Sequence, residues 1–307
     1  VTSPDYLGGV QDIPALAAVC RAQGVPLLVD NAHGAYLRFL PQNCHPIAQG
    51  AAMCCDSAHK TLPVVTGGAY LHLAHDAPVQ DEAAVRGALA LFGSTSPSYL
   101  ILQSLDACNA VLAGDYPRRL AQCCAALEGL RRSLNKAAAA RQCPVPLAVA
   151  GAQQEPMKLT LDAAALGCTG TALAEALRRA QLECEYADPR YVVLMFTPEN
   201  PPQDFERLQT ALEQLLAAVP AGLPRPENRA GEFAALQQQV VQCCTIRQAV
   251  LGAQVRIPVH KALGRVCAMP TVSCPPAIPV AVSGEEITPA AIALMQRYGI
   301  EELSVLR

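Results

Sequence analysis

The feature that most constrains the fold is a helix followed at once by a buried strand that ends in an acid. Residues 12–23, DIPALAAVCRAQ, space their apolar side chains as a helix does, with Asp12 placed to cap its start and Gly24 to stop it. The next segment, VPLLVD, is an apolar run that ends at Asp30. This order is the repeating unit of an open α/β sheet, where sites form beyond the carboxyl ends of the strands. We therefore expect chemistry at residues 30–34.

A second unit follows, and it places another polar loop beside the first. Residues 51–56, AAMCCD, are predicted to form a strand, and residues 67–73, GGAYLHL, another. The loop between them, SAHKTLP, contains Ser57, His59 and Lys60. Two successive buried strands are thus each followed by polar side chains.

The rest of the chain predicts a helical connection and two smaller units. Apolar spacing predicts helices over 98–113 and 120–140. Strand and helix signals then alternate, which is typical of a small α+β domain, and a Pro-rich stretch at 218–229 reads as a linker before a last unit. The alternating signals are strands at 157–162, 182–188 and 190–197, a helix after Thr169 and a helix at 203–218.

Composition and charge exclude several classes of protein. The 307 residues are 51% hydrophobic and 16% charged, as in a globular chain with a large core. The net charge is -3 and lysines and arginines do not cluster, so we expect neither nucleic acid nor a membrane as a partner. No apolar stretch approaches the roughly 20 residues that span a bilayer, and the first residues do not resemble a signal peptide. We expect a cytoplasmic protein.

The fourteen cysteines form no C-x-x-C pair. Adjacent doublets at 54–55, 123–124 and 243–244 suit neither tetrahedral metal ligation nor an ordinary disulfide. We expect reduced, buried cysteines that act as small hydrophobic side chains, and no metal site.

Asp30 and Lys60 together supply two groups that pyridoxal phosphate (PLP) needs. Taken alone, Lys60 is a surface lysine on a loop and Asp30 a turn former or helix cap. PLP requires a carboxylate that keeps its ring nitrogen protonated, a lysine that condenses with its aldehyde, and donors for its phosphate, to which Ser57 can contribute. The pair predicts a PLP site with Lys60 as the Schiff-base lysine. Neither loop holds a second lysine, since Lys136 and Lys158 belong to other segments.

Two segments around these residues, LLVDNAHGAYLRF and DSAHKTLPVVTGGAYLH, resemble the Orn/Lys/Arg decarboxylase family of fold-type I PLP enzymes. Residues 92–106, 183–200 and 264–288 are also similar to that family, in the same order, so the resemblance covers essentially the whole chain. A PP-x-IP-x-x-x-x-GE pattern distinguishes this family from ordinary aminotransferases; it comprises Pro275, Pro276, Ile278, Pro279, Gly284 and Glu285.

The resemblance implies roles for individual residues. Lys60, Asp30 and His59 would be catalytic, with Asp30 on the pyridine nitrogen and Lys60 bonded to the cofactor. Ala32 would pack under the ring, His33 would lie close by, and Ser57 and His59 would flank the cofactor.

The segment STSPS, residues 94–98, permits two readings. Capping of the helix that follows explains one or two of its hydroxyls. In the family, the matching segment approaches the phosphate of the neighbouring subunit, which makes Thr95 and Ser96 candidates for cofactor binding across a homodimer interface, or within a higher even oligomer. Both readings are compatible with each other.

The sequence also departs from the family. The family's first half, with its phosphate loop and the aromatic residue or histidine that stacks on the ring, has no counterpart, and the chain begins at Val1. We therefore expect a chain that lacks the N-terminal part. Cys274 and Ala277 replace the Tyr and Gly that are more usual in the family.

The expected architecture is α/β, with the remainder of a fold-type I, aspartate-aminotransferase-like large domain, a small α+β domain and a C-terminal α+β domain. The expected boundaries are 1–115 for the C-terminal part of the PLP-binding large domain, 116–220 for the connecting helix and small domain, and 230–307 for the C-terminal decarboxylase-type domain.

The implied activity is PLP-dependent decarboxylation of arginine, lysine or ornithine, which gives CO2 and an amine of the polyamine type. Two alternatives stay open: another fold-type I enzyme, such as an aminotransferase or carbon-sulfur lyase, and a truncated, inactive homologue. An aminotransferase typically grips the substrate carboxylate with an arginine, and here Arg190, just before the predicted strand YVVLMFT, is the only nearby candidate.

Overall fold

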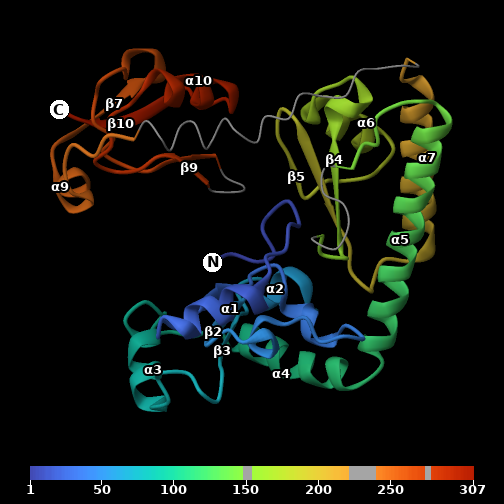
Figure 1. Ribbon diagram of the computed structural model, residues 1–307, viewed down its shortest axis with the longest axis horizontal. Helices are drawn as coiled ribbons and strands as arrows, with labels where there is room; N and C mark the ends of the chain where they lie inside the picture. The colour runs from blue at the N-terminus through green and yellow to red at the C-terminus, as the bar shows by residue number, and fades with distance from the viewer. Residues whose placement is uncertain (148–153, 221–239, 274–277) are drawn as a thin grey trace.

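The computed structural model describes residues 1–147, 154–220, 240–273 and 278–307. Figure 1 shows three regions along the chain, each with its own β-structure. Most of the predicted linker lies outside the described residues. So do Pro275 and Pro276 of the C-terminal family pattern, together with Cys274 and Ala277, which differ from the residues usual in the family.

The first region carries a three-stranded sheet in the order β1 (Leu28–Asp30), β2 (Met53–Asp56) and β3 (Tyr70–Leu73). β1 and β2 are parallel, and β3 is antiparallel to β2. Helix α1 (Ile13–Ala22) buries Ile13 and Ala17 against one face of this sheet. The helix begins and ends as predicted, because the Asp12 carboxylate accepts from the Ala15 amide at 3.0 Å and Gly24 has a φ of +65°.

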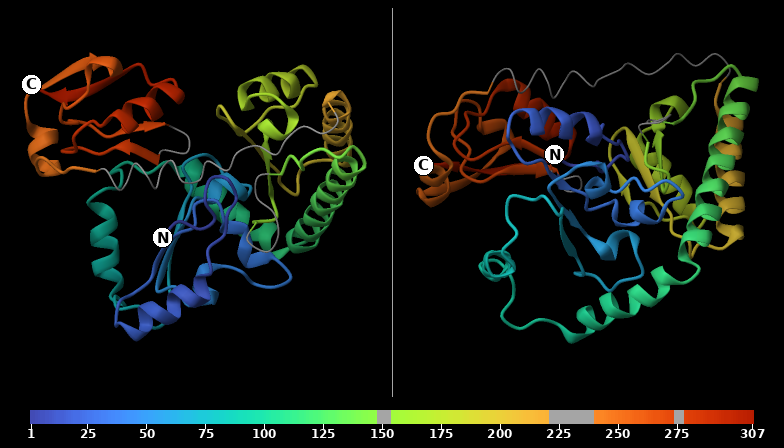
Figure 2. Two further views of the ribbon diagram at one scale, coloured as in Figure 1. Left: turned by 45° about the horizontal axis from the view of Figure 1, so that its top comes forward. Right: turned by 60° about the horizontal axis from the view of Figure 1, so that its bottom comes forward.

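Short helices follow the first two strands, and longer ones follow the third. The short ones are η1 (Ala35–Phe39), η2 (Pro46–Gln49) and α2 (Ala58–Thr61). The longer ones are α3 (Glu82–Ala90), α4 (Tyr99–Ala113) and α5 (Tyr116–Ala140), of which α3 was not predicted. In Figure 2, α3 stands away from the sheet, and residues 91–100 after it are all exposed.

The second region is an antiparallel sheet in the order β4 (Lys158–Asp162), β6 (Tyr191–Met195) and β5 (Tyr186–Ala187). η4 (Ala163–Leu166) and α6 (Gly170–Arg179) follow β4, and α7 (Pro202–Ala218) runs beside α5 (Figure 1). β5 is much shorter than the strand predicted at 182–188, because only two of its residues pair with β6.

The third region has its own core and two pairs of antiparallel strands. β7 (Gln254–Pro258) pairs with β10 (Glu302–Leu306), and β8 (Thr271–Ser273) pairs with β9 (Ile278–Ala281). The helices are α9 (Ile246–Leu251), η5 (Val259–Lys261) and α10 (Pro289–Arg297), and the core includes Ile287, Met295 and Val305.

The first two regions share one hydrophobic core. Tyr36 and Leu62 of the first region belong to the same buried cluster as Leu127 of α5 and Leu159 of β4. Backbone contacts reinforce this, because the loop at residues 5–9 lies along the start of β4. The Glu155 amide donates to the Gly8 carbonyl at 2.9 Å, and the Thr160 hydroxyl donates to the Leu7 carbonyl at 2.6 Å.

The exposure of the cysteines and the apolar character of the helices can also be compared with expectation. Among the described cysteines, Cys55 and Cys243 are exposed and six others are only partly buried, so the expectation of buried cysteines is confirmed for five: Cys54, Cys108, Cys123, Cys143 and Cys267. Within the described ranges, no helix is both long enough and apolar enough to cross a membrane.

Candidate active site

The two predicted loops lie side by side at the carboxyl ends of β1 and β2. Asp30 pairs with Cys55 in the parallel register. The Asn31 amide then donates to the Cys55 carbonyl at 2.9 Å, which carries the pairing one residue beyond β1. The sheet therefore sets the segment 30–34 beside the segment 57–60, as the sequence predicted.

Asp30 presents an exposed carboxylate at the end of β1. One of its oxygens accepts from the Ala32 amide at 3.1 Å, which folds the chain into a tight turn after the strand. The Cys55 thiol lies 3.8 Å from the same oxygen. The carboxylate retains acceptor capacity for a further donor.

Lys60 lies in α2, and its amine contacts His33 across the two loops. The Lys60 Nζ is 3.2 Å from the His33 Nε2. Burial of His33, together with the nearby positive charges of Lys158 and Lys60, lowers its pKa from 6.5 to about 3. The imidazole is therefore neutral, and its Nε2 accepts a hydrogen bond from Lys60.

The other ring nitrogen of His33 is buried without a partner among the described residues. Since Nε2 accepts, Nδ1 carries the proton of the neutral ring. A buried donor without an acceptor is costly, and such groups concentrate at binding sites. This buried donor makes the surroundings of His33 a candidate place for a ligand.

His59 and Ser57 complete the loop after β2. The His59 Nδ1 lies 3.0 Å from the Gly68 carbonyl, to which it donates, so its Nε2 is the acceptor in the neutral ring. Ser57 stands at the N-cap position of α2, but its side chain does not cap that helix.

A second lysine lies close to these groups, although it belongs to a distant segment of the chain. Lys158, at the start of β4, donates to the carbonyls of Asp5 and Tyr6 at 3.0 and 3.2 Å. Its ammonium lies 5.5 Å from the centre of the Tyr6 ring, which meets His33 edge-on at 5.0 Å. Burial lowers the pKa of Lys158. Position along the chain could not reveal this approach, because it depends on how the second region docks on the first.

The buried carboxyl group of Glu155, close to Lys158 in sequence, joins the first and second regions. Glu155 bonds to the Tyr36 hydroxyl and accepts from the Met157 amide at 2.7 Å. Burial raises the pKa of Glu155, against the opposing influence of Lys158 and the hydrogen bonds. This contact fixes how β4 sits against the loops of the site.

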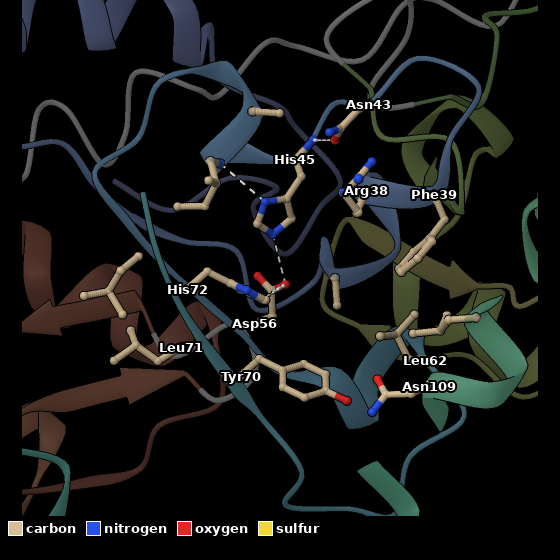
Figure 3. A pocket seen from close by; sticks show the side chains of 15 residues that line it. Arg38, Phe39, Asn43, His45, Asp56, Leu62, Tyr70, Leu71, His72 and Asn109 are labelled. Carbon is tan, nitrogen blue, oxygen red and sulfur yellow. Dashed lines mark hydrogen bonds and ion pairs between the residues drawn. The ribbon is translucent and has the colours of Figure 1, made fainter. Parts of the chain in front are cut away.

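Another group that the sequence did not single out surrounds Asp56, at the end of β2. The His45 and His72 Nε2 atoms lie 3.0 and 3.1 Å from the same Asp56 oxygen (Figure 3). Asn31 donates to the other oxygen at 2.7 Å, and the Cys54 thiol lies 3.3 Å from it. Burial acts to raise the pKa of Asp56, but the hydrogen bonds from His45, His72 and Asn31 outweigh it and hold the pKa below its usual range.

These histidines border a cavity of about 580 Å³ on the face of the sheet opposite Asp30. Figure 3 shows the two imidazoles directed at one carboxylate from separate segments of the chain. The cavity wall also includes Arg38, Phe39, Tyr70 and Asn109.

Thr95 and Ser96 are not brought to Lys60 of their own chain by any hydrogen bond within the described residues. Both are exposed in the connection between α3 and α4. The Ser96 amide bonds to the Ser94 hydroxyl at 3.1 Å, and Ser98 is the residue that caps α4, accepting from Ile101 at 3.5 Å. Capping therefore accounts for Ser98 and leaves the Thr95 and Ser96 side chains uncommitted to the helix.

The described part of the C-terminal pattern forms a turn. Gly284 has a φ of +92°, and a Cβ there would lie 2.3 Å from the Cys244 carbonyl oxygen, so a side chain is excluded. A carboxylate oxygen of Glu285 accepts from the Val282 amide at 2.9 Å. These residues shape the third region.

Comparisons with known proteins agree with the predicted family. The arginine decarboxylase of Bacillus subtilis (strain 168) is 28% identical over 296 residues, which cover 94% of this chain and 59% of that protein. The arginine decarboxylase of Bacillus anthracis is 27% identical over 300 residues, which cover 94% of this chain and 58% of that protein. The chain thus spans about three-fifths of the length of these curated relatives.

Among solved structures, the constitutive lysine decarboxylase of E. coli superimposes with a TM-score of 0.73 at 16% identity, over 100% of this chain and 57% of that one. This likeness shows the fold, an α/β architecture of PLP fold type I, as predicted. The family model for the major domain of Orn/Lys/Arg decarboxylases matches residues 1–203. The chain therefore belongs to the Orn/Lys/Arg decarboxylase family.

Proposed function

We propose that this chain carries the catalytic residues of a PLP-dependent decarboxylase for a basic amino acid: arginine, lysine or ornithine. The observation that carries the proposal is the contact between Lys60 and a neutral, buried His33, in a loop that also presents the exposed carboxylate of Asp30.

The donor set around Lys60 fits PLP. Asp30 accepts from the Ala32 amide through one oxygen and retains acceptor capacity that a protonated ring nitrogen can use. The Nδ1–H of His33 has no acceptor among the residues that the structure describes, and a polar atom of a bound group can supply one. Ser57 offers a hydroxyl that is not used to cap α2.

In this proposal, Lys60 bonds to the cofactor, Asp30 holds the ring nitrogen, Ala32 packs under the ring, and Ser57 and His59 flank it. Thr95 and Ser96 serve the phosphate of a partner subunit in a dimer or higher even oligomer. When bound, PLP supplies an aldehyde for the substrate amine and a ring that accepts the electron pair left by departing CO2.

The protein residues have their own tasks. His33 is neutral and accepts from Lys60, so it orients the amine without competing for its proton. His59, held through Nδ1 by Gly68, presents Nε2 as a proton acceptor. Asp30 supplies the negative charge that keeps the ring nitrogen protonated.

The contacts of Arg190 favour decarboxylation over amino transfer. Its guanidinium forms an ion pair with Asp162 at 2.8 Å and lies 5.1 Å from the centre of the Tyr191 ring. A side chain engaged in this way must leave its carboxylate partner before it can grip a substrate. The names of the relatives, arginine and lysine decarboxylases, point to a basic substrate and an amine product of the polyamine type.

We also propose that the chain is organised as 1–115, 116–220 and 230–307, for the large-domain part, the connecting helix with the small domain, and the C-terminal domain. The first border is proposed at the start of α5, which begins at Tyr116.

Release of CO2 and amine from arginine, lysine and ornithine, measured with added PLP, tests the function. We expect turnover of at least one of the three, and none by Lys60→Ala. A PLP spectrum without CO2 release, but with transfer of the amino group, would favour an aminotransferase. Absence of both signals would favour an inactive homologue.

A further inference from the structure

We propose that His45, Asp56 and His72 bind a divalent first-row transition-metal ion, at a site separate from the one that contains Lys60. The cysteine spacing had predicted no metal site, but these ligands are not cysteines. They come from the N-cap of η2, the end of β2 and the middle of β3, and their ligand atoms all lie within 4.8 Å of one another.

Each histidine nitrogen lies as far from the Asp56 oxygen as neighbouring ligands of an octahedral metal ion lie from each other. With metal–ligand bonds of about 2.1 Å, neighbouring corners of an octahedron are about 3.0 Å apart. The Asp56 oxygen lies 3.0 Å from the His45 Nε2 and 3.1 Å from the His72 Nε2. Two imidazoles and one carboxylate are a donor set that binds first-row metals and leaves other coordination positions open.

Access and support are both present. The side chain of His72 is 39% exposed and the cavity of about 580 Å³ borders all three ligands, which gives an ion a path and leaves room for water on the open positions. Asn31 donates to the second oxygen of Asp56 at 2.7 Å, which fixes the orientation of the carboxylate.

One contact must change when the metal binds. The Ile47 amide now donates to the His45 Nδ1 at 3.3 Å, so the proton of that ring is on Nε2. A metal on Nε2 moves the proton to Nδ1 and breaks this long contact. The proposal therefore predicts a change of tautomer at His45, which a purely hydrogen-bonded Asp56 would not show.

Titration of the chain with Co²⁺, after chelation and without PLP, tests the site independently of the proposed function. We expect one saturable Co²⁺ per chain, seen in the visible absorption of the ion. Charge-transfer bands would reveal binding at the fourteen cysteines instead. His72→Gln should raise the dissociation constant about tenfold or more. His75→Gln, at an exposed neighbour in sequence, should leave it within a factor of two.

His72→Gln is the decisive variant because the His72 side chain is partly exposed, so its replacement should disturb folding little. Asp56→Asn would instead disturb a buried carboxylate. Circular dichroism and thermal unfolding without metal check that each variant folds. Nitrogen NMR with Zn²⁺ should show the His45 proton move from Nε2 to Nδ1. Co²⁺ binding that is equal in wild type and His72→Gln, or no saturable binding at all, would overturn the proposal.

Discussion

The amine of Lys60 and the imidazole of His33 meet at 3.2 Å, across two loops that are 27 residues apart in sequence. His33 can accept here because it is neutral, and it is neutral because burial and the nearby charges of Lys158 and Lys60 oppose its protonation. The proposed Schiff-base lysine is thus held by a neighbour that does not carry a positive charge.

Replacement of Lys60 by Ala should abolish the covalent attachment of PLP. Lys158 is the other amine near this site, since its charge also acts on His33, and PLP could attach to it in place of Lys60. Its ammonium is occupied by the carbonyls of Asp5 and Tyr6, so we expect it not to substitute. Borohydride reduction followed by peptide mass spectrometry should locate PLP on Lys60 in the wild type and in Lys158→Met. A reduced adduct on any peptide of Lys60→Ala would remove Lys60 from its proposed role.

Asp30→Asn should leave PLP bound but slow decarboxylation by about a hundredfold or more, because an amide does not stabilise a protonated ring nitrogen. Asp30→Glu retains the charge and should do less harm. The comparison requires kcat for both variants with PLP content measured by absorbance. Near-normal turnover of Asp30→Asn would reduce this residue to a turn former, the role that its bond to the Ala32 amide already gives it.

The stability of the chain should fall in acid partly through His33. Between pH 6.5 and about 3, the unfolded chain binds a proton at this histidine and the folded chain does not. The free energy of unfolding is therefore unaffected by this histidine above pH 6.5, and it decreases as the pH falls from 6.5 toward 3. From pH 7 to 5 the loss from this one group should be about 2 kcal/mol.

Urea unfolding at both pH values measures this contribution. His33→Gln should lose less stability than the wild type over the interval, because glutamine does not titrate. His75→Gln, at an exposed position, should behave as the wild type. Identical pH dependence in wild type and His33→Gln would show that His33 titrates normally in the folded chain.

The sequence predicted most of what depends on neighbouring residues. Asp12 and Gly24 define α1 through local hydrogen bonding and a positive φ, so the pattern sufficed. Asp30 and Lys60 could be placed because strands of an α/β sheet end at one edge. β5 was overestimated, because the length of a strand depends on the partner that pairs with it.

Contacts between distant segments could not be predicted. Lys158 comes near His33 only because β4 docks on the loop at residues 5–9. His45, Asp56 and His72 have no regular spacing, and their meeting depends on the register of β2 with β3, in which Asp56 pairs with Tyr70. Such groups emerge from tertiary structure alone.

The connection between α3 and α4 is expected to take part in assembly of the subunits. Phe92 and Tyr99 are 93% and 83% exposed there, an apolar surface that a partner subunit would cover. If Thr95 serves the phosphate of the opposite site, Lys60→Ala and Thr95→Glu should each be inactive alone but complement each other after subunit exchange, because one site of a mixed dimer inherits both intact residues. Activity should reach at most half of the wild-type sites per mixed dimer. Ser94→Glu, beside Thr95, is the matched control and should retain activity alone. Mixtures that exchange subunits, as shown by light scattering and differently tagged chains, yet stay inactive would mean that Thr95 acts within its own subunit.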